Sequence, residues 1–281
     1  MNEDVTFLVS SCDKYEDAWE PFFRLFHIMG ADQATSNPAI LNTESKQYTC
    51  DFMQVRTINT PGKMTWSERM KSVLEQIESD YIFLLLEDFF IQSPFNLEYF
   101  NILMDYFRKH PEVGVIHTTP NSRFKEIPDE MFFERTFEDL NITVTAVIWR
   151  KDYLLKLLRK HESIWDFEWY VGKRAKHYPE RVMQYSEKFP RIYDYEIALN
   201  EGYGISQGKW LPKNKALFEK YGISVNFDNL GYSETDYESL GWKFLPDNNN
   251  NPYHSSKTPW GFAMRILYHY KNKIKARKSL K

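Results

Sequence analysis

The sequence predicts an α/β protein with a Rossmann-like, mostly parallel central sheet flanked by helices. Short apolar segments alternate with segments of helical periodicity from Val5 to His117. Tyr81–Leu86 is apolar throughout, which is typical of a strand buried on both faces of a parallel sheet. The chain has 281 residues, 42% of them hydrophobic, which is enough for one large domain with a substantial core. After Pro190, Gly, Asn and Pro become frequent, so we expect a loop-rich, partly helical C-terminal region.

Each element of the first half has a local signal. Apolar runs predict strands, and apolar residues spaced three and four apart predict helices. The expected strands are Val5–Ser11, Ala39–Asn42, Met53–Ile58, Tyr81–Leu86 and Val113–His117, and the expected helices are Asp17–His27, Thr65–Glu78 and Phe95–His110. Thr65 and Glu68 form a predicted capping box at the start of the second helix. Pro111 ends the third helix.

The second half is less regular. Ile142–Trp149 alternates like a strand, and Asp152–Lys160 and Trp165–Tyr178 have the pattern of helices. No internal repeat and no clean linker is evident, so we expect one domain over residues 1–259, with its second half beginning near residue 119 and a separate basic segment over 260–281.

Composition excludes several classes of protein. The aromatic and hydrophobic content excludes a disordered or collagen-like chain, and two cysteines, Cys12 and Cys50, exclude a disulfide scaffold. Met1–Asp4 has no basic segment typical of a signal peptide, and Tyr81–Leu86 is far shorter than a membrane span. We therefore expect a cytoplasmic protein.

The basic residues are unevenly distributed. Lys271–Lys281 contains six of the 36 basic residues and none of the 39 acidic ones, and the net charge is −3. An acidic body with a basic tail does not suit nucleic-acid binding. The aromatic and aliphatic segment Trp260–Tyr270 precedes the tail. Together they form either a helix that lies on an anionic membrane surface or a packed segment with a solvated end.

The clearest chemical feature is the acid pair Glu87-Asp88, which follows the apolar strand Tyr81–Leu86. Ligands of open α/β sheets bind at the carboxyl ends of strands, where carboxylates can hold a divalent cation and, through it, a diphosphate. The alternative is that the two acids only begin a solvated loop. The apolar Phe89-Phe90-Ile91 that follows makes this less favourable, because the acids then interrupt an apolar run.

Several common sites are missing from the sequence. There is no Gly-x-Gly-x-x-Gly, no Walker A loop and no Gly-x-Ser-x-Gly, and no cysteines and histidines have zinc spacing. These absences count against dehydrogenases, P-loop enzymes and α/β-hydrolases. They favour an enzyme that binds a nucleotide diphosphate through a metal.

On these segments the chain resembles the GT-A-fold glycosyltransferases of the type that decorate bacterial surface polysaccharides. Val5–Asp13 is similar to the first strand and its nucleotide-contacting turn, Thr65–Asp88 to the helix and strand that lead into the metal motif, and Ala146–Arg174 to the acceptor strand and acidic helix. The resemblance implies that residues 1–118 bind a nucleotide-diphosphate sugar, with UDP favoured, and that residues 119–259 bind the acceptor. It also implies Mn²⁺ or Mg²⁺ as cofactor, although Glu87-Asp88-Phe89 departs from the usual Asp-x-Asp.

The same resemblance implies a general base on the helix that begins near Trp165. Inverting family members use a carboxylate there to deprotonate the acceptor hydroxyl. Asp166 matches that position best, with Glu168 as the alternative. The two side chains diverge, because residues two apart lie about 200° apart on a helix. Both acids alternatively stabilise only the N-terminus of the helix.

Further candidates for the donor and metal sites come from the same segments. The expected nucleotide-sugar-binding residues are Ser10, Ser11, Asp13, Trp66, Arg69, Glu87 and Lys209, and the expected metal ligands are Asp88 and His254. Simpler interpretations remain for some of them: an Asx turn at Asp13, a surface arginine at Arg69 and a surface histidine at His254.

The prediction is therefore a glycosyltransferase that moves a sugar to a hydroxyl of a glycan or lipid-linked glycan at the inner face of the cytoplasmic membrane. Two alternatives stay open: a nucleotidyltransferase that makes an activated sugar, and a non-catalytic carbohydrate-binding protein. The first is weakened by the absence of glycine from Ser10–Tyr15. The second does not require acids at both Asp88 and Asp166.

Overall fold

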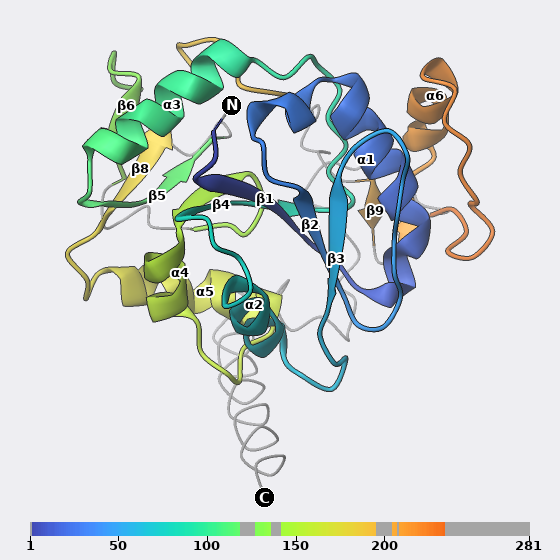
Figure 1. The fold of residues 1–281 in the computed structure, drawn as a ribbon, viewed down its shortest axis with the longest axis horizontal. Coiled ribbons are helices and arrows are strands. Elements are labelled where there is room, and N and C mark those ends of the chain that lie inside the picture. Colours follow the sequence, from blue (N-terminus) through green and yellow to red (C-terminus); the bar gives the residue numbers. More distant parts are fainter. Residues whose placement is uncertain (1, 119–126, 136–141, 195–203, 207, 234–281) are drawn as a thin grey trace, which may run out of the picture.

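The computed structural model describes residues 2–118, 127–135, 142–194, 204–206 and 208–233. Within them, one eight-stranded sheet has the order β3-β2-β1-β4-β7-β5-β8-β6. Its strands are β1 (Val5–Ser10), β2 (Ala39–Thr43), β3 (Val55–Asn59), β4 (Tyr81–Leu86), β5 (Val113–His117), β6 (Phe132–Glu134), β7 (Val147–Arg150) and β8 (Arg181–Tyr185). The predicted Rossmann-like, mostly parallel sheet is confirmed (Figure 1).

Strand β7 changes the direction of the sheet at its centre. The four strands β3, β2, β1 and β4 are parallel, and β5 is parallel to β8. Strand β7 lies antiparallel between β4 and β5, with Leu84 opposite Val147, and β6 is antiparallel to β8. β4 therefore has a parallel neighbour on one side only. Because β7 runs the opposite way, its first residue lies at the same edge of the sheet as the carboxyl ends of β4 and β5.

Helices cover both faces of the sheet. One face carries α1 (Trp19–Ile28) and α3 (Leu97–Lys109), and the other carries α2 (Trp66–Leu74), α4 (Lys151–Leu157) and α5 (Ile164–Ala175) (Figure 1). The alternation of β1 explains the two layers, since Phe7 belongs to the core cluster of α1 and α3 while Leu8 belongs to that of α2, α4 and α5. Ring contacts concentrate in the first layer, where Phe7 lies 4.9 Å from Phe26 and 5.2 Å from Phe83, between ring centroids.

Side-chain caps fix the start of the two helices that flank the predicted site. Thr65 accepts a hydrogen bond from the Glu68 amide, and Glu68 accepts one from the Thr65 amide, so the predicted capping box is present. Ser163 and Asp166 form the same reciprocal arrangement at α5. Each cap satisfies backbone donors that the first turn of a helix leaves without a partner.

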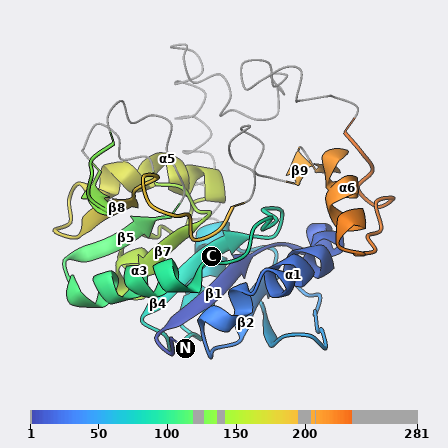
Figure 2. The same cartoon turned by 90° about the horizontal axis from the view of Figure 1, so that it is seen from above.

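A small unit follows the sheet in the described residues. Strands β9 (Ile205–Ser206) and β10 (Lys209–Trp210) form an antiparallel pair, and α6 (Lys213–Lys220) comes next. Both lie beside α1 in the two views (Figures 1 and 2). Trp210 packs against Phe90, which attaches this unit to the segment after β4. The predicted helix over Trp260–Lys281 lies outside the described residues.

Among the helices of the described residues, none is long and apolar enough to cross a membrane.

Candidate functional site

The predicted donor-site residues come together at the carboxyl ends of β1 and β4. These strands are adjacent and parallel, and Ser10 at the end of β1 is in register with Leu86 at the end of β4. The turn that carries Glu87 and Asp88 therefore lies beside the loop that follows Ser10. This is the edge at which α/β sheets bind ligands.

Of the acid pair, Glu87 is buried and Asp88 is half-buried. Glu87 is 6% exposed, and burial together with the charge of Asp88 holds the pKa of Glu87 well above its usual value, although Ser11 and Arg69 oppose the effect. Burial raises the pKa of Asp88 to about 7, against hydrogen bonds from backbone groups that include Ile205. Two desolvated carboxyls side by side stabilise a bound cation and lose much of their penalty when one binds.

Arg69 connects three segments beneath the acid pair. Its Nε donates to Thr60 Oγ1 at 2.9 Å, its Nη1 to Glu44 Oε1 at 3.0 Å and its Nη2 to the Ser11 carbonyl at 2.8 Å. The residue is 8% exposed. Arg69 thus fixes the loop after β1, and all three nitrogens of its guanidinium donate to protein acceptors.

The two serines are held by tryptophans. Trp66 Nε1 donates to Ser10 Oγ at 2.9 Å, and Trp19 Nε1 donates to Ser11 Oγ at 2.7 Å. Trp66 also packs against Phe167 of α5, with 5.2 Å between ring centroids. The loop after β1 is therefore positioned from both layers of the domain.

Asp13 organises the neighbouring loop after β2. Its carboxylate accepts hydrogen bonds from the amides of Glu44, Ser45 and Lys46 at 3.0 to 3.2 Å, and from the Ser45 hydroxyl. Burial acts to raise its pKa, but these hydrogen bonds outweigh it and lower the pKa to about 2. The Asp13 carboxylate therefore connects two distant segments, and its bonds to Glu44–Lys46 are not those of a local Asx turn.

The structure adds residues that the sequence patterns did not single out. Burial raises the pKa of Tyr15 to about 12, with contributions from the charges of Cys12, Glu87 and Asp88, so its ring lies near the acid pair. A Cβ on Gly208 would lie 2.6 Å from Lys14 Nζ and 3.9 Å from Tyr15 Oη, and Gly208 has φ +79°. The positive φ favours glycine there, whereas the flexible Lys14 side chain can move aside. The hairpin of β9 and β10 thus approaches the β1 loop, and Lys209, which follows Gly208, is exposed.

The same hairpin is bonded to the acid turn. The Gly204 amide donates to the Asp88 carbonyl at 2.5 Å, and Asn214 of α6 donates to the Gly204 carbonyl at 2.6 Å. A Cβ on Gly204 would lie 2.2 Å from the ring of Phe90. The acid turn is therefore held from the C-terminal side as well.

The two acids of α5 have different surroundings. Asp166 is 2% exposed and accepts hydrogen bonds from the amide and the hydroxyl of Ser163, at 3.1 and 2.7 Å, as part of the cap. Glu168 Oε1 accepts a bond from the Val144 amide at 2.8 Å. Burial raises the pKa of Glu168 to about 7. Glu168 is therefore bonded to the segment that leads into β7, which begins at Val147.

A strained residue lies between these groups. Ala146 has φ +58° and is the one non-glycine residue with positive φ among those described. Its carbonyl accepts bonds from both the amide and the hydroxyl of Thr118, at 3.1 and 2.7 Å. Such a conformation costs about 1–2 kcal/mol in an L-residue, and strain of this kind is concentrated at functional sites.

The acid pair fits a hard divalent cation only with help from a ligand. No group of three or more His, Cys, Asp or Glu side chains converges in the described part of the chain, and His254 lies outside it. Mg²⁺ is commonly held by one or two carboxylates together with substrate phosphates and water. Two desolvated carboxylates at a strand end meet that requirement.

Comparison with known proteins gives a likeness of fold. No family model and no curated protein matches the chain. Apo UDP-glucose pyrophosphorylase resembles it with a TM-score of 0.50 at 10% identity, over 79% of this chain and all of that one (100%). S. aureus TarS 1–349 in complex with UDP-GlcNAc resembles it with a TM-score of 0.46 at 12% identity, over 68% of this chain and 57% of that one. At these identities the pyrophosphorylase likeness establishes the α/β fold alone.

Proposed function

We propose that this chain is a glycosyltransferase that uses a nucleotide-diphosphate sugar. The observation that carries the proposal is the acid pair Glu87-Asp88 at the carboxyl end of β4, beside the loop that follows β1. Glu87 and Asp88 directly follow β4, and Glu168 of α5 accepts a hydrogen bond from Val144, in the segment that leads into β7. Transfer from a nucleotide-diphosphate sugar needs positive charge at the leaving diphosphate and a base at the acceptor hydroxyl, and these groups provide a place for each.

In this proposal Asp88 holds Mn²⁺ or Mg²⁺ with support from Glu87, and the cation neutralises charge on the leaving diphosphate. The backbone of the β1 loop, fixed by Arg69 and the two tryptophans, lines the nucleotide pocket. Lys14 and Lys209 supply positive charge for the diphosphate of the donor. A UDP-linked sugar is the favoured donor, and a hydroxyl of a glycan or lipid-linked glycan is the acceptor.

Glu168 is the proposed general base, in preference to Asp166. Asp166 is committed to the α5 cap, whereas Glu168 accepts one backbone bond and has a pKa near 7. A base with a pKa near the working pH is both available and effective. An inverting transfer then needs no covalent intermediate on the protein.

Two assays test the proposal. In a thermal-shift screen of the full-length protein, UDP with Mn²⁺ should stabilise it more than nucleoside triphosphates do. With a panel of UDP-sugars and glycan acceptors, mass spectrometry should then detect UDP release matched by an acceptor one sugar heavier. Release of pyrophosphate from a nucleoside triphosphate and a sugar 1-phosphate would instead identify a nucleotidyltransferase. Binding of glycans without turnover would identify a carbohydrate-binding protein.

We also propose that the segment over 260–281 attaches the protein to anionic membranes. Six cations near such a surface contribute at most about 1 kcal/mol each, so the binding is expected to be reversible and sensitive to salt. Full-length protein should sediment with anionic but not neutral vesicles at low salt. A full-length variant with all six cations changed to Gln should remain in solution.

A further inference from the structure

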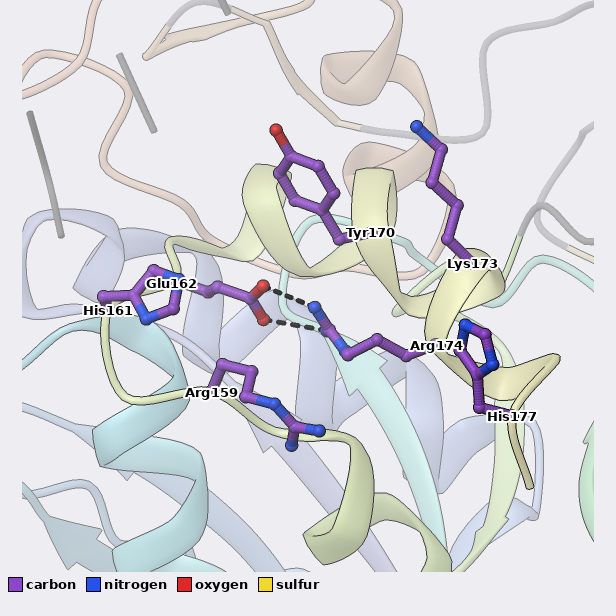
Figure 3. Close-up of a pocket in the computed structure, with 7 residues that line it drawn as sticks. All are labelled: Arg159, His161, Glu162, Tyr170, Lys173, Arg174 and His177. Carbon is purple, nitrogen blue, oxygen red and sulfur yellow. Dashed lines mark hydrogen bonds and ion pairs between the residues drawn. The ribbon is translucent and has the colours of Figure 1, made fainter. Parts of the chain in front are cut away.

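Helix α5 borders a second polar site, an open hollow of about 360 Å³ (Figure 3). The hollow lies between α5 and the segment that joins it to α4. With 3.6 residues per turn, Tyr170 and Lys173 lie about 160° and about 140° around α5 from Glu168. None of the predicted donor-site residues lines the hollow.

An ion pair occupies the centre of this hollow. Arg174 Nη1 and Nη2 donate to the two carboxylate oxygens of Glu162 at 2.5 and 2.8 Å, and Glu162 is 1% exposed. Burial raises the pKa of Glu162 to about 7, although the charge of Arg174 acts to lower it. Within the described chain, Arg174 Nε is buried without a hydrogen-bond partner. The floor of the hollow is thus poorly solvated, and charges there interact more strongly than at an open surface.

Two more permanent cations border the hollow. Arg159 is fixed at Nη1, which donates to the carbonyls of Lys156 and Leu158 at 2.8 and 2.9 Å. Lys173 Nζ lies 5.4 Å from the ring centroid of Trp169 and 5.6 Å from that of Tyr170. Neither Arg159 nor Lys173 forms a salt bridge with a carboxylate in the described part of the chain.

The lining therefore has an excess of positive charge. Arg159, Lys173 and Arg174 line the hollow together with one carboxylate, Glu162. In Figure 3 the Lys173 side chain points away from the ion pair, and His161 and His177 lie at the two sides of the pair. The protein as a whole has a net charge of −3, so this excess is local. Most lysines and arginines with charged partners in the described residues lie on open surface, whereas Arg159 and Arg174 lie around one buried carboxylate.

We propose that this hollow binds a phosphate group carried on a small polar molecule, such as a phosphorylated sugar. A phosphate presents several acceptor oxygens, which suit the fork of a guanidinium and the point charge of an ammonium. A volume of about 360 Å³ exceeds what an isolated ion needs and falls in the range of about 300–1,000 Å³ typical of small-molecule sites. The ring of Tyr170 provides a surface for the carbon skeleton. The inference does not rest on the proposed transferase activity.

Calorimetric titration of the full-length protein tests it. Glucose 6-phosphate should bind saturably, inorganic phosphate should bind more weakly and glucose should not bind. The double variant Arg159→Gln/Lys173→Gln should weaken glucose 6-phosphate binding at least tenfold. The control Lys71→Gln/Lys215→Gln removes the same charge from exposed positions of α2 and α6 and should bind normally. Arg174 is left intact, because removing it would leave Glu162 buried and alone.

Four results would overturn the proposal. The first is the absence of saturable binding of glucose 6-phosphate, and the second is an equal loss of affinity in the control variant. The third is binding that survives Arg159→Gln/Lys173→Gln but is lost in Asp88→Asn, which would put the ligand in the donor site. The fourth is binding to vesicles of phosphatidic acid that Arg159→Gln/Lys173→Gln weakens while glucose 6-phosphate does not bind, which would identify a membrane surface as the ligand of the hollow. Unchanged circular dichroism melting of each variant excludes unfolding as the cause.

Discussion

Glu168→Gln is the substitution that probes most directly how the site is built. Burial raises the pKa of Glu168 to about 7 from the 4.5 of an unperturbed glutamate. One pKa unit corresponds to about 1.4 kcal/mol. Ionised Glu168 therefore destabilises the folded state by about 3 kcal/mol at pH 8, where the carboxyl is charged in both the folded and the unfolded state.

The penalty should vanish as the pH falls. Below pH 4.5 the carboxyl is protonated in both states, and at pH 5 only about 1 kcal/mol of the difference remains. A glutamine amide oxygen can still accept the bond from the Val144 amide. Glu168→Gln should therefore raise the free energy of unfolding by about 3 kcal/mol at pH 8 and by about 1 kcal/mol at pH 5.

Urea denaturation followed by tryptophan fluorescence at pH 5, 6.5 and 8 measures this difference. The exposed Glu219→Gln serves as control and should change stability by less than about 1 kcal/mol at every pH. A gain that is the same at pH 5 and pH 8 would refute the raised pKa. The same variant should lose about 10²- to 10⁴-fold in turnover if Glu168 is the base. A more stable variant with full turnover would show that Glu168 is only a buried carboxyl.

Three further substitutions test other parts of the structure. Asp88→Asn should abolish the stabilisation by UDP with Mn²⁺ in a thermal-shift assay. The melting temperature of the free protein should not fall, because a neutral amide replaces a desolvated carboxyl. An undiminished shift with UDP and Mn²⁺ would exclude Asp88 as the metal ligand. Arg69→Met should lower the free energy of unfolding, measured by urea denaturation, by about 3 kcal/mol or more, since Glu44 and the Ser11 carbonyl lose their donor. A loss below about 1 kcal/mol would contradict the connecting role of Arg69. Gly114→Ala should lower the free energy of unfolding in urea by about 1–3 kcal/mol, because the added Cβ would lie 2.3 Å from the Tyr153 ring. An unchanged free energy of unfolding would mean that the ring moves aside freely.

Elements with strong local signals were predictable from the sequence. The capping box at Thr65 and the apolar run Tyr81–Leu86 each specify their structure without help from distant residues. Strand β7 is shorter than predicted: it spans Val147–Arg150 rather than Ile142–Trp149, because the positive φ of Ala146 interrupts the extended conformation. Strands β6 and β8 were not predicted, since they are specified mainly by pairing with each other and with β5 across long stretches of chain.

The candidate site was predictable where its chemistry is local. An acid pair that interrupts an apolar run is visible in one segment, and its position at the end of β4 follows from the expected strand. The role of Arg69 was not visible, because its partners Thr60, Glu44 and Ser11 come from three separate segments. The proximity of Lys14 to Gly208 likewise depends on a contact across nearly two hundred residues of chain.

The insertion of β7 has a consequence for synthesis of the protein. A nascent chain that has emerged only as far as His117 contains β1 to β5, yet β4 and β5 have no pairing with each other. Until Arg150 is available, the inner edge of β4 has no partner, and exposed strand edges promote association between chains. We expect a fragment that stops at His117 to aggregate. During synthesis, β4 and β5 then depend on β7, which is translated about thirty residues after His117. A pause of the ribosome between His117 and Arg150 would leave the apolar strand β4 exposed along one edge.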